Sequence, residues 1–192
     1  MFKKEWEDSY SSNQLQNKNQ YPSEEVIHFL MHKFSKSKDK SKINILELGC
    51  GWGNNLKFLK DQGFSYVGVD FSESAIKHCK KYHKNVYCCS IDQLPFKSDK
   101  FDIVLDRMAI QHNPMNIIKK TFLEVKRVLK DNGFFYSNLV EEANYTFKTT
   151  YLTTFDIKNI SSIFSKVDLE SVVRYKENGE IISKINILIA TK

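Results

Sequence analysis

Apolar runs alternate with helical periodicity along most of the chain after residue 42. A short apolar run closed by a glycine or a charged residue is typical of a buried strand. Strands that alternate with helices predict an α/β fold with a mainly parallel sheet covered on both faces. Five such runs predict strands, at Ile43–Leu48, Tyr66–Val69, Val86–Cys89, Phe101–Leu105 and Phe134–Val140.

Three segments between these runs have the spacing of helices. The first is Asn54–Gln62, and the second follows Ser72, whose hydroxyl is a favourable helix cap. The third begins at Pro114 and is expected to end at Asp131-Asn132-Gly133. Its apolar residues recur at steps of three and four, at Met115, Ile118, Phe122, Val125 and Leu129.

The two ends of the chain complete the pattern. Ser23–Phe34 predicts an amphipathic helix, and Thr154–Phe164 predicts the last helix. Val167–Tyr175 and Ile185–Ala190 predict an antiparallel strand pair around the loop Lys176–Glu180. The inward residues expected for the first of these helices are Val26, Ile27, Leu30 and Phe34.

The charge balance is basic, with 29 Lys and Arg against 23 Asp and Glu, a formal net charge of +6. A basic chain can attract an anionic partner. However, the only arginines are Arg107, Arg127 and Arg174, and arginine is the usual residue for phosphate and base recognition. The densest lysine run, Ser35–Lys42, has the composition of a solvated linker. We therefore expect no nucleic-acid partner.

The composition also indicates the cellular compartment of the protein. No apolar run approaches the roughly 18–20 residues that a membrane span needs, and the charged segment Met1–Asp8 has no secretory character. The cysteines lack the spacing of a disulfide framework, so we expect reduced thiols in a cytoplasmic protein. They are Cys50, Cys79, Cys88 and Cys89. Cys79 and His83 share a helical face, but the adjacent Cys88 and Cys89 alternate faces on a strand, so no metal site is expected.

A glycine-rich turn, Glu47–Gly53, lies between the first strand and the first helix. Such a turn lets a ligand approach the backbone, and the helix N-terminus offers free N–H groups. Two features separate it from a dinucleotide site. The dinucleotide pattern needs a glycine where this chain has Asn54, and it has no acid at the position of Glu47.

Asp70 closes the second strand, 21 residues after Gly49. A carboxylate at this place can accept both hydroxyls of a ribose. The alternative is that Asp70 caps the following helix, a position that Ser72 serves better.

These segments resemble the motifs of class I S-adenosylmethionine-dependent methyltransferases, small stand-alone enzymes in particular. Ile45–Asn55 is similar to their first motif and Tyr66–Ser72 to their second. Ser90–Phe96 followed by Phe101–Leu105 resembles a third conserved segment. The resemblance implies a doubly wound, seven-stranded, mainly parallel sheet with an antiparallel last strand, the Rossmann-like methyltransferase fold. It also implies S-adenosylmethionine as cofactor and S-adenosylhomocysteine as product.

The resemblance also implies roles for single residues. Glu47 would brace the turn, Asp70 would hold the ribose, and Phe71 would lie against the adenine. Ile91 would offer its backbone N–H to the adenine, and Asp106 would stand near the cofactor's amino group. The remaining cofactor residues that we predict are Gly49, Cys50, Gly51, Gly53, Asn54 and Ser90.

Ser90 departs from the family, which usually has an acid at this position. The acid that reads the adenine amino group is therefore not identified. Asp92 is close in sequence, but regular local structure would point it elsewhere.

Two residues are candidates for a catalytic base. His112 follows the fourth strand, on the loop side where a substrate would meet the methyl group. The unperturbed pKa of histidine, about 6.5, suits a base at neutral pH; the alternative is a structural or solvated histidine. Asp106 is the second candidate. Arg107 could pair with an anionic substrate, or it could form a surface ion pair.

Residues 1–42 form a leader and helix that we expect to cover the cofactor and substrate, and 43–192 the catalytic domain. Trp6 and Tyr10 in the leader either take part in this cover or simply pack on the core. The segment Glu141–Leu152, which contains Tyr145, Phe147 and Tyr151, is expected to wall the substrate pocket.

The sequence therefore predicts methyl transfer to a small-molecule acceptor, with a sugar or a sugar nucleotide suggested by analogy. An RNA or protein methyltransferase would show a continuous basic face and salt-dependent binding. A non-catalytic protein that keeps the fold as a scaffold would bind the cofactor weakly. A nicotinamide oxidoreductase is disfavoured by Asn54.

Overall fold

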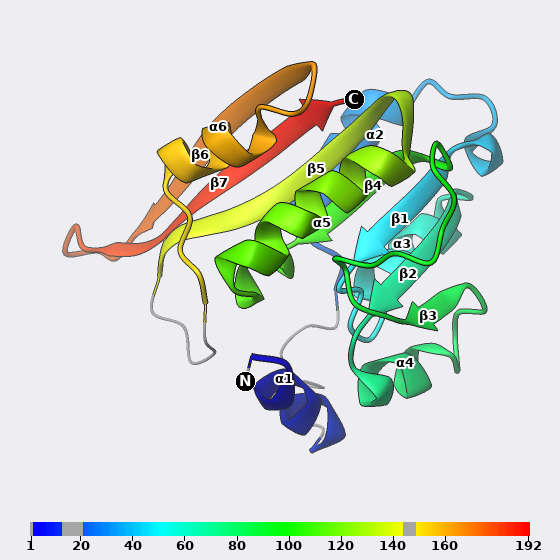
Figure 1. Cartoon of the computed structure of the whole chain (residues 1–192), viewed down its shortest axis with the longest axis horizontal. Coiled ribbons are helices and arrows are strands. Elements are labelled where there is room, and N and C mark those ends of the chain that lie inside the picture. The colour runs from blue at the N-terminus through cyan, green and yellow to red at the C-terminus, as the bar shows by residue number, and fades with distance from the viewer. Residues whose placement is uncertain (1, 13–20, 144–148) are drawn as a thin grey trace.

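A single mixed sheet organises the chain in a computed structural model that describes residues 2–12, 21–143 and 149–192. The strand order among these residues is β3-β2-β1-β4-β5-β7-β6 (Figure 1). Strands β1 to β5 run parallel, and β7 is antiparallel to both of its neighbours. This confirms the predicted fold class. The strands are β1 Asn44–Leu48, β2 Ser65–Asp70, β3 Val86–Cys88, β4 Phe101–Arg107, β5 Leu129–Ala143, β6 Lys166–Tyr175 and β7 Ile181–Thr191.

Helices cover both faces of the sheet because strand residues alternate between the faces. On one face, α2, α3 and α4 pack against Ile45, Ile103 and Tyr136. On the other face, α5 and α6 pack against Val104 and Phe135. The helices are α1 Phe2–Ser11, α2 Glu24–Phe34, α3 Asn54–Asp61, α4 Glu73–Cys79, α5 Met115–Val128 and α6 Thr154–Ser161, with 3₁₀ turns η1 Lys40–Lys42 and η2 Ile110–His112.

Two details of the predicted elements are wrong. Helix α5 ends at Val128 rather than at Asp131-Asn132-Gly133, because buried Leu129 already pairs with Phe101 as the first residue of β5. The expected stop signal forms an irregularity within β5 instead, where Asn132 has a φ of +62°. In α2, Phe29 is buried and Ile27 is only half-buried.

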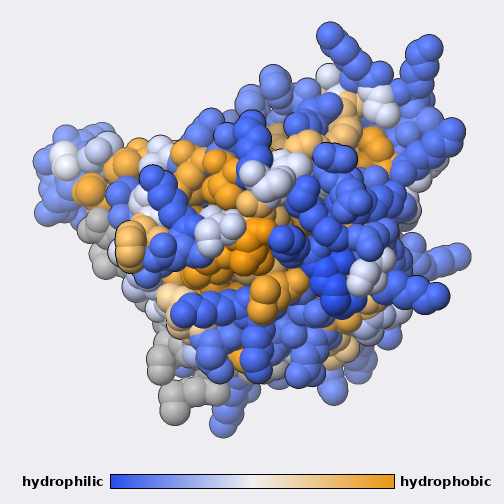
Figure 2. Space-filling model, turned by 45° about the horizontal axis from the view of Figure 1, so that its top comes forward, coloured by the Kyte–Doolittle hydropathy of each residue, from blue (hydrophilic) through white to orange (hydrophobic). Residues whose placement is uncertain are grey.

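The surface mixes hydrophilic and apolar side chains. Figure 2 shows a central apolar area on one face, surrounded by hydrophilic side chains. Exposed apolar residues include Leu123 and Phe155, which lie on α5 and α6. Across the described ranges, no helix is both long enough and apolar enough to cross a bilayer.

Replacing Phe122 by alanine should destabilise the fold by about 3–5 kcal/mol. The ring is fully buried, and its centroid lies 5.3 Å from that of Phe135 and 6.5 Å from that of Phe164. The neighbouring Leu123 is 59% exposed, so L123A is the matched control, with a change of about 0.5 kcal/mol or less. Urea unfolding of both variants measures the difference, and equal losses would show that α5 is not packed as described.

Candidate functional site

The predicted site residues gather at one edge of the sheet. The carboxyl ends of parallel strands lie side by side, as the register pairs Leu48 with Val69 and with Asp106. Asp70 is likewise paired with Cys88 at the end of β3. The segments after β1, β2, β3 and β4 therefore meet there, which is where ligands bind in open α/β sheets.

The glycine-rich turn between β1 and α3 has a backbone that only glycine adopts readily. Gly49, Gly51 and Gly53 have φ values of +63°, +51° and +84°. A Cβ added at Gly49 would lie 2.2 Å from the Cβ of Ala109. These glycines let the chain reverse tightly and bring its backbone against the loop after β4.

Asp70 locks this turn to the end of β2. One carboxylate oxygen accepts a hydrogen bond from the backbone N–H of Gly51 at 2.9 Å, and the other accepts one from Ser72 N–H at 2.9 Å. The residue is buried, and burial raises the pKa of Asp70 to about 6 against the lowering effect of these bonds. Ser72 caps α4 by accepting from Ala75 N–H at 3.0 Å, so the capping alternative for Asp70 is not needed.

Glu47 links the turn to two helices. One of its oxygens accepts a hydrogen bond from the Asn55 amide at 2.6 Å, and Asn55 in turn accepts from the backbone N–H of Ser23 at 2.8 Å. The second oxygen of Glu47 is buried and has no hydrogen-bond partner among the described residues. Burial raises the pKa of Glu47 to about 8, so the carboxyl group holds its proton at neutral pH. Asn55 was not among the predicted site residues, although it lies inside the first motif.

The segment after β3 brings the side chains of Ser90 and Asp92 together. The Ser90 hydroxyl donates a hydrogen bond to the Asp92 carboxylate at 2.5 Å. The two side chains form one polar unit next to buried Ile91. Phe71 is half-buried after β2, and its carbonyl accepts from the Cys88 thiol at 3.4 Å.

Asp106 braces the loop after β4. One oxygen accepts from the N–H groups of Ala109 and Ile110 at 2.8 and 3.1 Å, and the other accepts from the Ser137 hydroxyl at 2.6 Å. The side chain is fully buried, which raises the pKa of Asp106 to about 6. A carboxylate engaged in three internal hydrogen bonds is a poor candidate for the base, so His112 is the stronger one.

His112 lies between α1 and the segment that follows β5. Its ring centroid is 4.8 Å from that of Trp6, and its Nδ1 is 3.2 Å from the Thr149 hydroxyl oxygen. The backbone N–H of Thr150 donates to the Gln111 carbonyl at 2.8 Å, which draws the segment after β5 toward η2. Tyr145 and Phe147 of the expected pocket wall lie outside the described residues, and Tyr151 is 44% exposed.

Helix α1 lies across this edge of the sheet (Figure 1). Glu7 accepts hydrogen bonds from the hydroxyl and the N–H of Ser74 at 2.6 and 3.3 Å, which fastens α1 to the start of α4. The ring centroids of Tyr10 and Trp52 are 5.7 Å apart. The Tyr10 hydroxyl oxygen lies 2.7 Å from the place that a Cβ would take if Gly51 were replaced by a larger residue. The placement of Tyr10 over the glycine turn could not be derived from the spacing of motifs.

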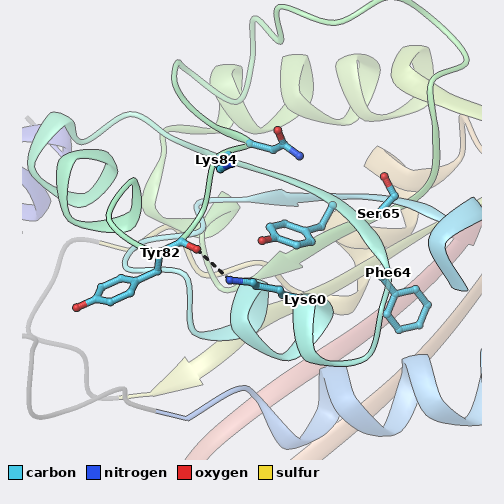
Figure 3. A pocket seen from close by; sticks show the side chains of 7 residues that line it. Lys60, Phe64, Ser65, Tyr82 and Lys84 are labelled. Carbon is cyan, nitrogen blue, oxygen red and sulfur yellow. Dashed lines mark hydrogen bonds between the residues drawn. The ribbon is translucent and has the colours of Figure 1, made fainter.

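A separate cavity of about 290 Å³ lies at the opposite edge of the sheet. It is lined by residues around the amino ends of β2 and β3, with the Lys60 ammonium donating to the Tyr82 carbonyl at 3.5 Å (Figure 3). Because it opens at the amino ends of the strands, this cavity is not part of the candidate site. Its lining residues are Lys60, Phe64, Ser65, Tyr66, Tyr82, Lys84 and Asn85.

Comparison with known families gives one match over the core of the site. Residues 46–137 match the model of a family described as the methyltransferase domain. This range holds the glycine turn, Asp70, the Ser90–Asp92 unit and His112.

Among curated proteins, the chain is 32% identical over 117 residues to the phthiotriol/phenolphthiotriol dimycocerosates methyltransferase of Mycobacterium tuberculosis, covering 57% of this chain and 43% of that protein. It is 30% identical over 113 residues to the fatty-acid O-methyltransferase of Mycolicibacterium smegmatis, covering 55% and 40%. The matches therefore span less than half of the length of these relatives.

Among solved structures, the chain superposes on the 1,6-didemethyltoxoflavin-N1-methyltransferase of Burkholderia thailandensis with a TM-score of 0.74. The superposition covers 98% of this chain and 86% of that chain, at 16% identity. A likeness at this identity establishes the fold.

The raised pKa of Glu47 makes stability depend on pH. In the unfolded chain this group ionises near pH 4.5, and in the folded chain near pH 8. The folded state is therefore progressively destabilised as the pH rises between these values. E47Q imitates the protonated group, so it should match the wild type at pH 4.5 and exceed it by a few kcal/mol at pH 8.

Urea unfolding at several pH values measures this difference. The control is E177Q, since Glu177 lies in the exposed β6–β7 loop and its replacement should leave the pH profile unchanged. Parallel profiles of wild type and E47Q would contradict a protonated, buried Glu47.

Proposed function

We propose that this chain, which belongs to the class I S-adenosylmethionine-dependent methyltransferases, transfers a methyl group to a small-molecule acceptor. The observation that supports this most strongly is the glycine turn fastened by Asp70 beside the buried carboxyl group of Glu47. S-adenosylmethionine supplies an electrophilic methyl group on a sulfonium when it is bound. The residues of the chain then have to bind it, align the acceptor and exclude water.

The ribose is assigned to Asp70. Each of its oxygens accepts one backbone hydrogen bond, and a carboxylate oxygen can accept more than one. Both oxygens therefore keep capacity for a ribose hydroxyl while they hold the turn. Two neighbouring acceptor oxygens fit the two ribose hydroxyls of an adenosyl group.

The amino acid end of the cofactor is assigned to the surroundings of Glu47. Its buried second oxygen lacks a partner among the described residues, which suits a cationic ammonium group. A nearby positive charge would lower the pKa of Glu47 from about 8, so this carboxyl group would lose its proton on binding. The Gly49–Gly53 backbone would approach the same end of the cofactor, with Cys50 and Asn54 in the turn.

The adenine is assigned to the ends of β2 and β3. Phe71 offers a ring face, and the backbone N–H of Ile91 is the proposed donor to the base. The Ser90–Asp92 unit supplies a carboxylate two residues after the family's usual position. We propose that this displaced acid reads the adenine amino group.

His112 is the proposed base on the acceptor side. A hydroxyl acceptor must lose a proton during transfer, and a positioned histidine can take it. Trp6 packs on the imidazole ring, and Thr149 contacts its Nδ1, so both neighbours restrict its orientation. Residues 1–42 contribute α1 as a cover that excludes water from this centre, and we propose the catalytic domain itself for 43–192.

A small molecule is the proposed acceptor class. The names of the relatives give phthiotriol/phenolphthiotriol dimycocerosates, a fatty acid and 1,6-didemethyltoxoflavin, so the acceptor differs among them. The near absence of arginine supports a metabolite over a nucleic acid. A sugar or a sugar nucleotide remains the acceptor that analogy suggests.

Replacing Asp70 by alanine should weaken the binding of S-adenosylhomocysteine by about 1–3 kcal/mol, the range for a hydrogen bond to a charged group. Calorimetry of the folded variant measures this, after thermal shift with both forms of the cofactor has established binding by the wild type. D168A is the control, because Asp168 is an exposed residue of β6. An unchanged affinity of D70A would remove the ribose role.

Replacing His112 by alanine should lower turnover by about 100-fold or more, the scale of general base catalysis. The affinity for S-adenosylhomocysteine should stay within about two-fold, a change below 0.5 kcal/mol. A metabolite panel first identifies an acceptor, and kcat is then compared with that of H32A, since His32 is exposed on α2. Full activity of H112A would exclude it from the mechanism.

A further inference from the structure

We propose that Arg107 is the anchor for an oxyanion group, a carboxylate or a phosphate, on the acceptor. This inference rests on the proposed function, because it concerns the acceptor side of the same site. It makes Arg107 a specificity-determining residue and gives the acceptor a chemical class. Three features support it: Arg107 has no ion-pair partner among the described residues, it stands at the end of β4, and a buried amide lies beside it.

The three arginines differ sharply in their partners. Arg127 donates to the Glu124 carboxylate and to the carbonyls of Leu94 and Phe96, with distances between 2.7 and 3.1 Å. Arg174 pairs with Glu25 at 3.1 Å. Arg107 forms no ion pair within the described part of the chain, and its Nε is buried without a hydrogen-bond partner. The described residues therefore do not contain the surface ion pair that was the alternative role for Arg107.

None of the described acidic groups near Arg107 forms an ion pair with it. Glu25 is already engaged by Arg174 and by the Ser23 hydroxyl, which donates to it at 2.6 Å. Asp106 accepts hydrogen bonds from Ala109, Ile110 and Ser137 and forms no ion pair with Arg107 among the described residues. Glu47 carries its proton at neutral pH because it is buried. A partly buried guanidinium without a counterion is unfavourable, and an anionic ligand would relieve this.

Arg107 stands where an acceptor has to be held. It is the last residue of β4, directly after Asp106, and its Cα is in register with that of Asn138 on β5. Its charge acts on Glu47, whose second oxygen we assign to the cofactor's ammonium group. An anion bound by Arg107 would therefore lie beside the amino acid part of the cofactor, which is bonded to the sulfonium that carries the methyl group.

Asn138 adds a second buried polar group at this place. Its side chain is 1% exposed and close enough to the Tyr136 hydroxyl to act on the pKa of that group, but no hydrogen bond of normal geometry joins its oxygen or its nitrogen to a described residue. A guanidinium fork matches the geometry of carboxylate and phosphate oxygens. The amide nitrogen of Asn138 could donate to the same group. Together the two side chains form a recognition pair for an oxyanion.

The test uses small oxyanions with matched neutral counterparts in the presence of S-adenosylhomocysteine. The probes are octanoate against octanamide, benzoate against benzamide, and phenyl phosphate against phenol. Thermal shift and ligand-observed NMR report binding to the full chain. The carboxylate and phosphate series distinguish the two sources of an oxyanion.

The variants are R107Q, R107K and, as a control, K36Q, which removes the same charge from an exposed lysine. Oxyanion probes should protect wild type and K36Q, and R107Q should lose about 10-fold or more in affinity, a factor that corresponds to about 1.4 kcal/mol. R107K keeps the charge without the fork and should bind less tightly than wild type. R107Q should be as stable as wild type without ligand, whereas loss of a structural ion pair would lower its melting temperature.

Three results would overturn the proposal. They are equal protection by neutral probes, failure of every oxyanion to protect wild type, and equal binding by R107Q and wild type. A loss of S-adenosylhomocysteine affinity in R107Q as large as its loss of oxyanion affinity would also overturn it, since Arg107 would then hold the cofactor's own carboxylate. If wild type fails to bind S-adenosylhomocysteine, the proposed function fails. The oxyanion series without that ligand then decides the role of Arg107 separately.

Discussion

The Asp70 carboxylate is the interaction on which the site depends. It joins the end of β2 to the glycine turn after β1 and to the start of the segment that leads into α4. A backbone hydrogen bond from Cys50 N–H to the Val69 carbonyl at 2.9 Å also joins the turn to β2, and the Asp70 carboxylate extends this link to Ser72. The cost of burying the carboxylate is visible in its pKa of about 6. A buried acid with a raised pKa at such a place is typical of a ligand site.

A second chain of contacts ties the turn to the helices around it. Glu47 holds Asn55, and Asn55 holds the backbone N–H of Ser23 at the start of α2. Glu7 binds Ser74 from the other side and places α1 over the edge of the sheet. Helices α1 and α2 therefore both border the site. Changes in α2 should affect the turn through the two hydrogen bonds that link Ser23 to Asn55 and Asn55 to Glu47. Changes in α1 should affect it through Tyr10, whose hydroxyl lies against Gly51.

The sequence was sufficient where structure follows from local chemistry. The turn at Gly49 needs positive φ, Asp70 ends an apolar strand, and Ser72 is a good cap, so each could be predicted from nearby residues. The end of α5 was predicted wrongly because the pairing of Leu129 with Phe101 overrides the local stop signal. Tertiary contacts of this kind leave no trace in a single segment.

The contacts on the acceptor side also could not be predicted from neighbouring residues in the sequence. An arginine in any sequence can indicate an anion site. Only the fold shows that the acids near Arg107, Glu25 and Asp106, have other partners. The partnership of Ser90 with Asp92 likewise depends on how the segment after β3 turns. The position of Tyr10 over Gly51 joins residues that are far apart in the chain. Such contacts have to be observed.

A crystal structure of the chain with bound S-adenosylhomocysteine would show whether Asp70 and Glu47 hold the cofactor. We expect both ribose hydroxyls to bind the Asp70 carboxylate and the amino group of the ligand to lie at Glu47. A ligand that is bound elsewhere and contacts neither carboxyl group would contradict this assignment.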